Sequence, residues 1–267
     1  MQWILQDFED TARLAEALDR LGLDHSWHKV VPFVGDLVPE PVVVDPRSVV
    51  MFGSYALRHH AEREGLHPGV FVLRPFVHEA VWQPFLLNGP DARFVMLRDV
   101  PARVHEDDTA WFVRPVDDSK AVAGGVKTGS ELVATARKVL ALDEADIPNG
   151  SLRHDTELML CRPARILREW RVWIVAGRVV TCSLYKEGAR VVYRREIDDD
   201  AAAFAQRMAD ANPDYSPAYV IDICRTEDGL RLLETNCINA AGFYAADLVK
   251  LATAIEDLDR PPRSTAA

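Results

Sequence analysis

The sequence has few of the features that mark secreted, disulfide-bonded or membrane-spanning proteins. It contains four cysteines, and no two of them form a Cys-x-x-Cys pair, so buried reduced thiols are expected. No apolar run approaches the roughly 20 residues that a membrane helix needs. The acidic stretch at residues 1–10 also lacks the apolar core of a signal peptide. We therefore expect a cytoplasmic protein with no membrane partner.

The motifs of several large enzyme classes are also missing. The sequence has no Gly-x-Ser-x-Gly nucleophile elbow, no Walker-type glycine loop and no dinucleotide-binding fingerprint. His25 and His28, and the adjacent His59 and His60, have no third ligand at a recognised zinc spacing. These absences argue against acyl-enzyme hydrolases, Rossmann dehydrogenases and histidine-based zinc sites.

The charge balance excludes a further class of partner. The 31 basic and 41 acidic residues give a net charge of −10, which argues against general binding of nucleic acids, although a local basic groove for a nucleotide is compatible with it. A hydrophobic content of 48% and a charged content of 27% are ordinary for a soluble globular protein. The length allows one large domain or two or three smaller ones.

Apolar periodicity and turn signals predict alternating helices and strands. Helices are expected at residues 7–21, 55–64, 129–142, 198–211 and 244–258. Strands are expected at residues 27–33, 47–52, 70–73, 111–114, 157–161, 170–175 and 178–185. The first elements form a small α/β domain at residues 1–98. A second domain follows at residues 99–260, and the tail at residues 261–267 is expected to fray.

The most informative stretch is a predicted β-hairpin at residues 219–236. If its loop is residues 227–229, Asp222 lies directly opposite Glu234, and Asn236 shares their face. Two opposed carboxylates repel each other. A hard cation would reverse the repulsion, since Mg²⁺ prefers oxygen ligands of this kind. The alternative is a pair of solvated carboxylates.

Two loops contain weaker signals. Gly53 and Ser54 lie between a predicted strand and a predicted helix, where they either bind an anion at the helix N-terminus or make a tight turn. The loop at residues 116–126 contains Lys120 and two adjacent glycines. This composition suits a lid over phosphates, although most loops of this kind bind none.

One predicted strand has two charged residues on the same side. Glu169 and Arg171 flank Trp170, so they share the face opposite the indole. Such a pair serves either a polar pocket or a solvated sheet face, and the residues alone leave both open.

Taken in order, four segments resemble the ATP-grasp superfamily of carboxylate–amine ligases, and most closely its small, stand-alone bacterial and phage members. The segments are FVRPVDDSK at 112–120, REWRVWIVAG at 168–177, YVIDI at 219–223, and LLETN at 232–236 extending through Gly242. The resemblance covers residues 100–258, and the N-terminal part resembles that clade's pre-ATP-grasp domain more loosely. It implies an α+β ATP-grasp fold, in which two α+β lobes clamp ATP, preceded by a small α/β domain.

The resemblance implies a set of nucleotide contacts. Arg114 stands where most members have a phosphate-binding lysine, so Lys120 supplies or shares that role. Leu160 and Cys161 match the strand that reads adenine through its backbone. Glu169 matches the acidic residue that binds the ribose hydroxyls.

It also implies catalytic, metal and substrate residues. The basic residues expected to face phosphates or the acyl phosphate are Lys120, Arg171 and Lys186. The residues that resemble the magnesium triad are Asp222, Glu234 and Asn236. The residues expected to border the acceptor substrate are Ser54, Asn239 and Gly242.

The implied activity is an ATP- and Mg²⁺-dependent ligase. Such an enzyme activates a carboxylate as an acyl phosphate and couples it to an amine, forming an amide or peptide bond. Small-molecule or peptide carboxylates and amines are the expected substrates, and a homodimer is compatible with the resemblance. Two alternatives stay open: an ATP-dependent phosphotransferase acting on a small acceptor, and a nucleotide-binding module without turnover.

Overall fold

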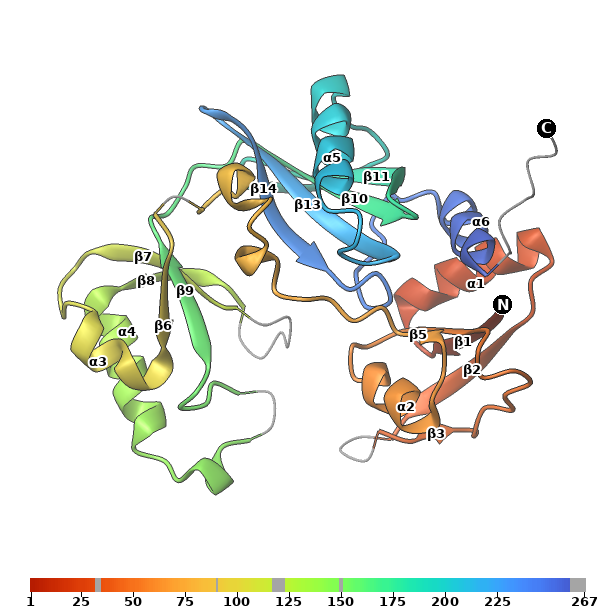
Figure 1. Cartoon of the computed structure of the whole chain (residues 1–267), viewed down its shortest axis with the longest axis horizontal. Coiled ribbons are helices and arrows are strands. Elements are labelled where there is room, and N and C mark those ends of the chain that lie inside the picture. Colours follow the sequence, from red (N-terminus) through yellow and green to blue (C-terminus); the bar gives the residue numbers. More distant parts are fainter. Residues whose placement is uncertain (32–34, 90, 117–122, 149–150, 260–267) are drawn as a thin grey trace. The chain divides into compact units, whose positions relative to one another are not determined.

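The protein forms two compact units in a computed structural model that describes residues 1–31, 35–89, 91–116, 123–148 and 151–259 (Figure 1). The larger unit contains residues 1–73 and 167–267, and the smaller contains residues 74–166. The domain boundary expected near residue 98 rests on family motifs rather than on compactness, so it stays a prediction. The tail expected to fray, at residues 261–267, lies outside the described residues.

The first sheet of the larger unit is mainly parallel and has the strand order β3-β2-β1-β4-β5. Its strands are β1 (Gln2–Gln6), β2 (His25–Val30), β3 (Leu37–Val38), β4 (Val49–Phe52) and β5 (Pro68–Gly69). The central strand β1 runs parallel to β2 and β4, and helix α1 (Glu9–Leu21) connects β1 to β2. This β-α-β connection gives the N-terminal part its predicted α/β character.

Two strand assignments in this sheet differ from the sequence prediction. Strand β1 was not expected, because Trp3 to Leu5 form a short apolar run without alternation, as a strand buried on both faces does. The strand predicted at residues 70–73 is wrong. Pro68 and Gly69 make the pairing with β4, and the Phe71 amide donates to the Asn239 side chain at 2.9 Å instead of to a strand.

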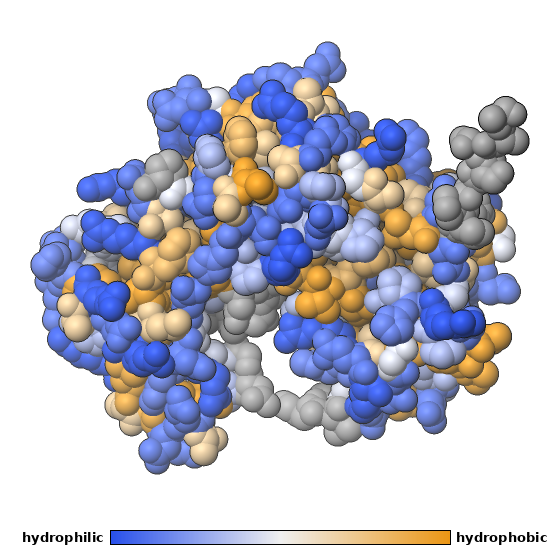
Figure 2. All heavy atoms as spheres, viewed as in Figure 1, coloured by the Kyte–Doolittle hydropathy of each residue, from blue (hydrophilic) through white to orange (hydrophobic). Residues whose placement is uncertain are grey.

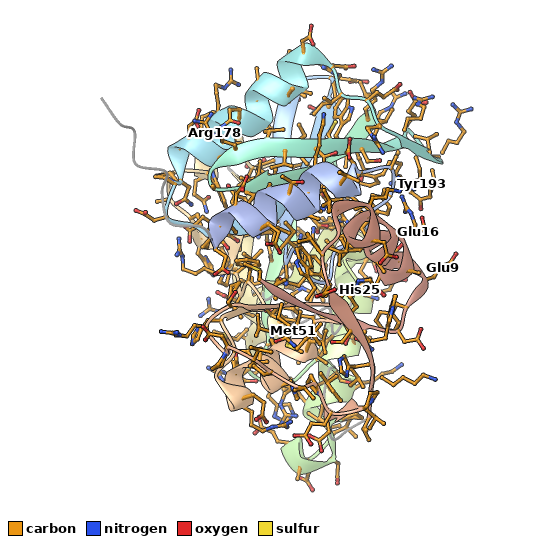
Figure 3. The ribbon with its side chains drawn as sticks, turned by 90° about the vertical axis from the view of Figure 1, so that its right-hand side faces the viewer. Glu9, Glu16, His25, Met51, Arg178 and Tyr193 are labelled. Carbon is orange, nitrogen blue, oxygen red and sulfur yellow. The ribbon has the colours of Figure 1, made fainter. Side chains whose placement is uncertain are left out.

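Helices cover both faces of this sheet. Helices α1 and α6 (Leu248–Leu258) pack side by side on one face, and α2 (Leu57–Glu64) lies on the other (Figures 1 and 3). The α1–α6 core contains Trp3, Leu5, Leu14, Leu18, Phe52, Leu251 and Ile255. Burial of each large apolar side chain contributes roughly 1.5–3 kcal/mol. The hydrophilic face of α1, with Glu9 and Glu16, is left to solvent (Figure 3).

The second sheet of the larger unit is antiparallel and has the order β12-β11-β10-β13-β14. Its strands are β10 (Arg168–Val175), β11 (Arg178–Glu187), β12 (Arg190–Arg194), β13 (Ala218–Thr226) and β14 (Gly229–Asn236). Helix α5 (Asp199–Ala211) packs on β11 and β13 and buries Phe204 and Met208. The predicted β10–β11 pair and the hairpin are therefore confirmed.

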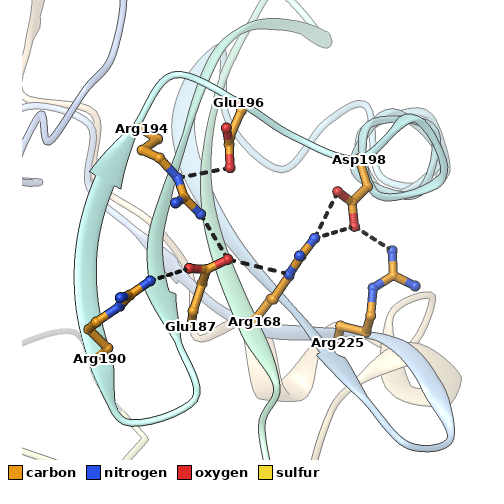
Figure 4. A network of polar contacts seen from close by, with 7 residues as sticks. All are labelled: Arg168, Glu187, Arg190, Arg194, Glu196, Asp198 and Arg225. Carbon is orange, nitrogen blue, oxygen red and sulfur yellow. Dashed lines mark hydrogen bonds and ion pairs between the residues drawn. The ribbon is translucent and has the colours of Figure 1, made fainter.

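A network of ion pairs joins four of these strands to the start of α5 (Figure 4). Its members are Arg168, Glu187, Arg190, Arg194, Glu196, Asp198 and Arg225. Hydrogen bonds from Arg190 and Arg194 hold the pKa of Glu187 below its ordinary value. Because these groups are largely exposed, each pair adds little to stability.

The smaller unit contains one antiparallel sheet with the order β6-β9-β7-β8. Its strands are β6 (Arg93–Met96), β7 (Ala110–Pro115), β8 (Gly125–Thr128) and β9 (Glu157–Cys161). Helices α3 (Val100–Arg103) and α4 (Gly129–Leu140) belong to the same unit, and Leu132, Val133 and Ala136 of α4 pack on one face of the sheet. The predicted strands at 111–114 and 157–161 and the predicted helix at 129–142 are confirmed. Strands β6 and β8 were not predicted.

The remaining surface and helix features agree with a globular protein. Hydrophilic residues cover much of the face shown in Figure 2, with hydrophobic residues scattered between them. No helix within the described ranges is long and apolar enough to cross a membrane. All four cysteines are free, and three of them are buried: Cys161, Cys224 and Cys237.

Candidate active site

Strands β13 and β14 place Asp222 directly opposite Glu234, as predicted. The loop that produces this pairing is different from the expected one. Gly229 already belongs to the paired strand, so the loop is residues 227–228. A β-bulge at Leu233, which has no partner on β13, supplies the missing residue and restores the pairing. The predicted contact is thus confirmed, although its predicted cause is wrong.

Arg171 continues this row of side chains onto β10, where it lies opposite Asp222. Its Nε and Nη2 atoms donate to the two Asp222 carboxylate oxygens at 2.9 and 2.8 Å. Both side chains are buried, Asp222 completely. The two residues therefore form a bidentate, charge-assisted ion pair inside the sheet face.

Burial controls the protonation of this pair. It raises the pKa of Asp222 to about 7, because Arg171 offsets only part of the desolvation and the nearby Glu234 charge adds to it. Burial acts to lower the pKa of Arg171, but the Asp222 carboxylate outweighs it and leaves that pKa above its ordinary value. The guanidinium group therefore stays charged, and it is the fixed positive charge of the site.

Asn236 completes the set expected to bind a metal. Its Nδ2 atom lies 3.3 Å from an Asp222 oxygen and 3.1 Å from a Glu234 oxygen, so the amide points between the two carboxylates. Rotation of the amide by half a turn would place its oxygen there instead. Two carboxylates and an amide oxygen are the donors that Mg²⁺ prefers, so the three residues fit this ion. In the described part of the chain, no cluster of three or more His, Cys, Asp or Glu side chains forms an alternative metal site.

Glu169 lies two residues before Arg171 and is also buried. The Tyr185 hydroxyl donates to its Oε2 atom at 2.7 Å, and Lys186 Nζ forms an ion pair with Oε1 at 2.9 Å outside hydrogen-bond geometry. Consecutive residues reach one carboxylate because the β10–β11 register shifts at this point. Burial, together with the nearby carboxylates, raises the pKa of the Tyr185 hydroxyl.

Tyr244 adds an aromatic surface that the sequence did not reveal. Its ring stacks with Tyr185 and with Tyr193, at centroid distances of 5.2 and 5.0 Å. The Arg171 guanidinium carbon lies 4.7 Å from the centre of the Tyr244 ring. The backbone of Tyr244 is left-handed, with φ of 47°, a strained conformation for a non-glycine residue. The helix predicted from residue 244 consequently begins later, after its cap at Asp247.

Asn239, expected near the acceptor, holds the backbone together. Its Oδ1 accepts the Phe71 amide at 2.9 Å, and its Nδ2 donates to the Met51 and Gly69 carbonyls at 2.7 and 3.4 Å. The buried side chain thus links the loop after β14 to the ends of β4 and β5. This geometry indicates a positioning role, and a contact with substrate stays a prediction.

The other two residues expected near the acceptor lie in different surroundings. The Gly242 carbonyl accepts a hydrogen bond from Arg171 at 3.3 Å, so it borders the polar cluster. A Cβ added to Gly242 would lie 3.4 Å from an Asp10 carboxylate oxygen. The Ser54 amide donates to the Gln6 side chain at 2.8 Å, and α2 begins three residues later, so this amide does not lie at the free end of a helix.

The residues expected to bind the nucleotide in the smaller unit lie on β7 and β9. Arg114 donates to the Pro115 carbonyl at 3.3 Å, and its guanidinium carbon lies 5.1 Å from the centre of the Phe76 ring. Leu160 and Cys161 are buried in β9, and burial raises the pKa of the Cys161 thiol to about 11. Lys120 lies outside the described residues. The nucleotide contacts of these residues stay predictions.

Six of the predicted residues therefore form one polar cluster on the antiparallel sheet of the larger unit. They are Glu169, Arg171, Lys186, Asp222, Glu234 and Asn236. The structure adds Tyr185 and Tyr244, which strict strand alternation and helix periodicity could not place beside this cluster. The aromatic ring that follows Gly242 in sequence was the available signal for Tyr244.

Comparison with solved structures shows the same fold in three ligases. The chain is similar to D-cycloserine synthetase DcsG (16% identity over 97% of this chain and 100% of that chain, TM-score 0.63). It is similar to the ATP-grasp ligase PsnB complexed with precursor peptide PsnA2 and AMPPNP (14%, 96% and 96%, 0.53). It is also similar to D-alanyl-alanine synthetase A from Vibrio cholerae O1 biovar eltor (11%, 96% and 98%, 0.56).

Sequence comparison assigns the family. No curated protein matches the sequence. The model of an ATP-grasp domain, the third family of its clade, matches residues 24–255. This match begins well before the segments at residues 100–258 that suggested the resemblance, and it covers most of the chain. The chain belongs to the ATP-grasp superfamily, as a member of this ATP-grasp domain family.

Proposed function

We propose that this protein is an ATP- and Mg²⁺-dependent ligase that couples a carboxylate to an amine. The observation that carries the proposal is the convergence of Asp222, Glu234 and Asn236 beside the buried charge of Arg171. Its family, and the names of the ligases that share its fold, support the ligase class. The proposed substrates are small-molecule or peptide carboxylates and amines.

The first proposed step is phosphoryl transfer to the carboxylate. A carboxylate oxygen of the substrate attacks the γ-phosphorus of ATP, the bond from this phosphorus to the bridging oxygen breaks, and ADP leaves. Mg²⁺, bound by Asp222, Glu234 and Asn236, supplies positive charge to the phosphate oxygens. Arg171 offers a second positive charge, and Asp222 and Tyr244 hold its guanidinium in one orientation.

The second proposed step forms the amide. The amine nitrogen attacks the acyl carbon, the bond to the phosphate oxygen breaks, and inorganic phosphate leaves with that electron pair. The nitrogen releases one proton to solvent. Lys186 and Arg171 would offset negative charge on the reacting acyl group, and Glu169 and Tyr185 fix Lys186 in place. Arg114, Lys120, Leu160, Cys161 and Glu169 are the proposed nucleotide contacts.

A screen of carboxylate and amine pairs tests the proposal. The protein is incubated with ATP, Mg²⁺ and each pair, and ADP, phosphate and the acceptor products are quantified. A ligase forms ADP, phosphate and amide in equal amounts, and chelation of Mg²⁺ with EDTA stops all three. A stable phosphorylated acceptor would instead identify a phosphotransferase. Nucleotide binding without ADP formation for any pair would favour a module without turnover.

A further inference from the structure

The smaller unit contains a cavity of about 430 Å³ that none of the roles above uses. The ends of β6 and β9, the start of β7 and the end of α3 line it. The volume lies within the range of sites for small molecules, roughly 300–1,000 Å³.

The strand register separates this cavity from the expected nucleotide contacts. Arg93 on β6 pairs with Leu160, and Trp111 precedes by two residues the β7 partner of Leu160. Side chains alternate along a strand, so Arg93, Leu160 and Trp111 share the face that α4 covers. Arg114 and Cys161 are each one residue away from that set, so their side chains lie on the opposite face.

The wall of the cavity carries an excess of positive charge. Arg93, Arg103 and Arg162 line it and are exposed, and none of them forms an ion pair with a described residue. The carboxylate of the lining residue Asp107 accepts the Thr109 amide at 3.0 Å instead of pairing with an arginine. In a chain with a net charge of −10, three arginines without acidic partners around one cavity form a local anion-attracting region.

The floor of the cavity is apolar. Leu160 and Val95 are buried there, and Trp111 is partly buried. The Arg93 guanidinium carbon lies 5.1 Å from the centre of the Trp111 ring. A guanidinium stacked on a ring keeps its in-plane N–H donors for a planar carboxylate or a phosphate.

We propose that this cavity binds a small organic anion that has a carboxylate or phosphate head group and an apolar portion. The arginines bind the head group through bidentate hydrogen bonds, and Trp111, Val95 and Leu160 contact the apolar portion. This site is independent of the proposed ligase activity, because it uses none of the residues assigned to metal or phosphate chemistry.

Nuclear magnetic resonance on the full-length ¹⁵N-labelled protein tests the proposal. Phenyl phosphate and phthalate serve as phosphate and carboxylate probes, and benzamide is the uncharged probe with the same ring. The indole N–H signal of Trp111, assigned with Trp111→Phe, is followed during each titration. At least one anion should shift this signal saturably, and the stronger of the two identifies the preferred head group. Benzamide should shift it weakly.

Two arginine variants separate a built site from general charge attraction. Arg103→Gln should weaken binding of the anion by about tenfold or more, since it removes charge-assisted hydrogen bonds. Arg98→Gln, on the same segment but outside the cavity lining, should leave affinity unchanged. The absence of a Trp111 shift with both anions, or equal affinities in the two variants, would overturn the proposal.

Discussion

Arg171 and Asp222 form a buried ion pair on which the rest of the candidate site depends. Arg171 also contacts the Gly242 carbonyl and the Tyr244 ring, so a single guanidinium connects the metal-type residues to the loop after β14. Removal of one partner would leave the other charge buried without compensation. Substitutions at Asp222 therefore change folding as well as any metal binding.

We predict that Asp222→Asn lowers the free energy of unfolding by about 3–5 kcal/mol, because Arg171 stays charged and loses its counter-ion. The double variant Arg171→Leu with Asp222→Leu should lose less than the two single leucine variants together, since no unpaired charge remains. Urea unfolding followed by circular dichroism measures all four proteins. Additive losses would contradict the coupling.

Asn239 provides a second prediction at the level of one residue. Asn239→Ala removes the partners of three backbone groups, those of Phe71, Met51 and Gly69, so it should lower the free energy of unfolding by roughly 3 kcal/mol. The predicted contact with substrate leads elsewhere: an unchanged stability in urea unfolding, together with a raised KM, would show that Asn239 acts mainly on the acceptor.

At the level of elements, the sequence predicted the pairing of side chains better than its cause. Asp222 and Glu234 could be paired because alternation and a turn signal define a hairpin. The bulges near Leu233 and Tyr185 could not be foreseen, because a bulge depends on the fit of neighbouring strands. The bulge at Tyr185 turns this side chain toward Glu169, which is why sequence analysis missed it.

Strands buried on both faces were the other weakness of sequence analysis. Strand β1 shows no alternation, and only its partners β2 and β4 reveal that it is central. The residues at 70–73 show the opposite error. They have strand-like composition, but Asn239, far away in the sequence, takes the amide of Phe71. Tertiary contacts decided both cases.

The start of α4 allows a prediction for one helix. Thr128 accepts the Glu131 amide at 3.1 Å, and the Glu131 carboxylate accepts the Thr128 amide at 2.8 Å, which is a capping box. Thr128→Ala should lower the free energy of unfolding by about 1 kcal/mol. Thr135→Ala is the matched control, because this exposed threonine lies inside the same helix and bonds only the preceding turn. Equal losses in thermal unfolding would argue against the cap.

The Glu131 carboxylate also gives this cap a pH dependence. The Thr128 amide holds the pKa of Glu131 below its ordinary value. The contribution is therefore complete above the pKa of the unfolded chain and is lost as the pH falls through the folded pKa. The difference in stability between the wild type and Glu131→Gln should shrink in acid.

For the whole molecule, the buried thiols predict a loss of stability in alkali. Burial raises the pKa of Cys224 to about 12 and that of Cys161 to about 11. Above the ordinary thiol pKa of about 8.5 the unfolded chain loses these protons first, so stability falls as the pH rises toward the folded values. Each thiol contributes a slope of about 1.4 kcal/mol per pH unit.

Urea unfolding between pH 8 and pH 10.5 measures this slope, with these limits set at about the pKa of a free thiol and about two units above it. Cys224→Ala should flatten it relative to the wild type, whatever the variant does to stability at neutral pH. A slope that is the same in both proteins would show that Cys224 does not titrate as its burial implies.

The whole-molecule assignment came from an ordered set of weak motifs rather than from one strong motif. The segments around Arg171, Asp222 and Glu234 gave the superfamily, and the family match confirms it over residues 24–255. Substrate identity does not follow in the same way. Ser54, Asn239 and Gly242 lie in loops whose conformation depends on contacts with distant strands.

The central claim is that Asp222, Glu234 and Asn236 bind the Mg²⁺ that accompanies the nucleotide. Glu234→Gln is the sharpest variant, because it keeps the shape of the side chain and leaves the Arg171–Asp222 pair intact. Glu227→Gln, in the exposed loop of the same hairpin, is the matched control. Calorimetry of AMPPNP binding with and without Mg²⁺ gives the gain in affinity due to the metal. The account predicts that Glu234→Gln reduces this gain by about tenfold or more and that Glu227→Gln preserves it. An undiminished gain in Glu234→Gln would contradict it.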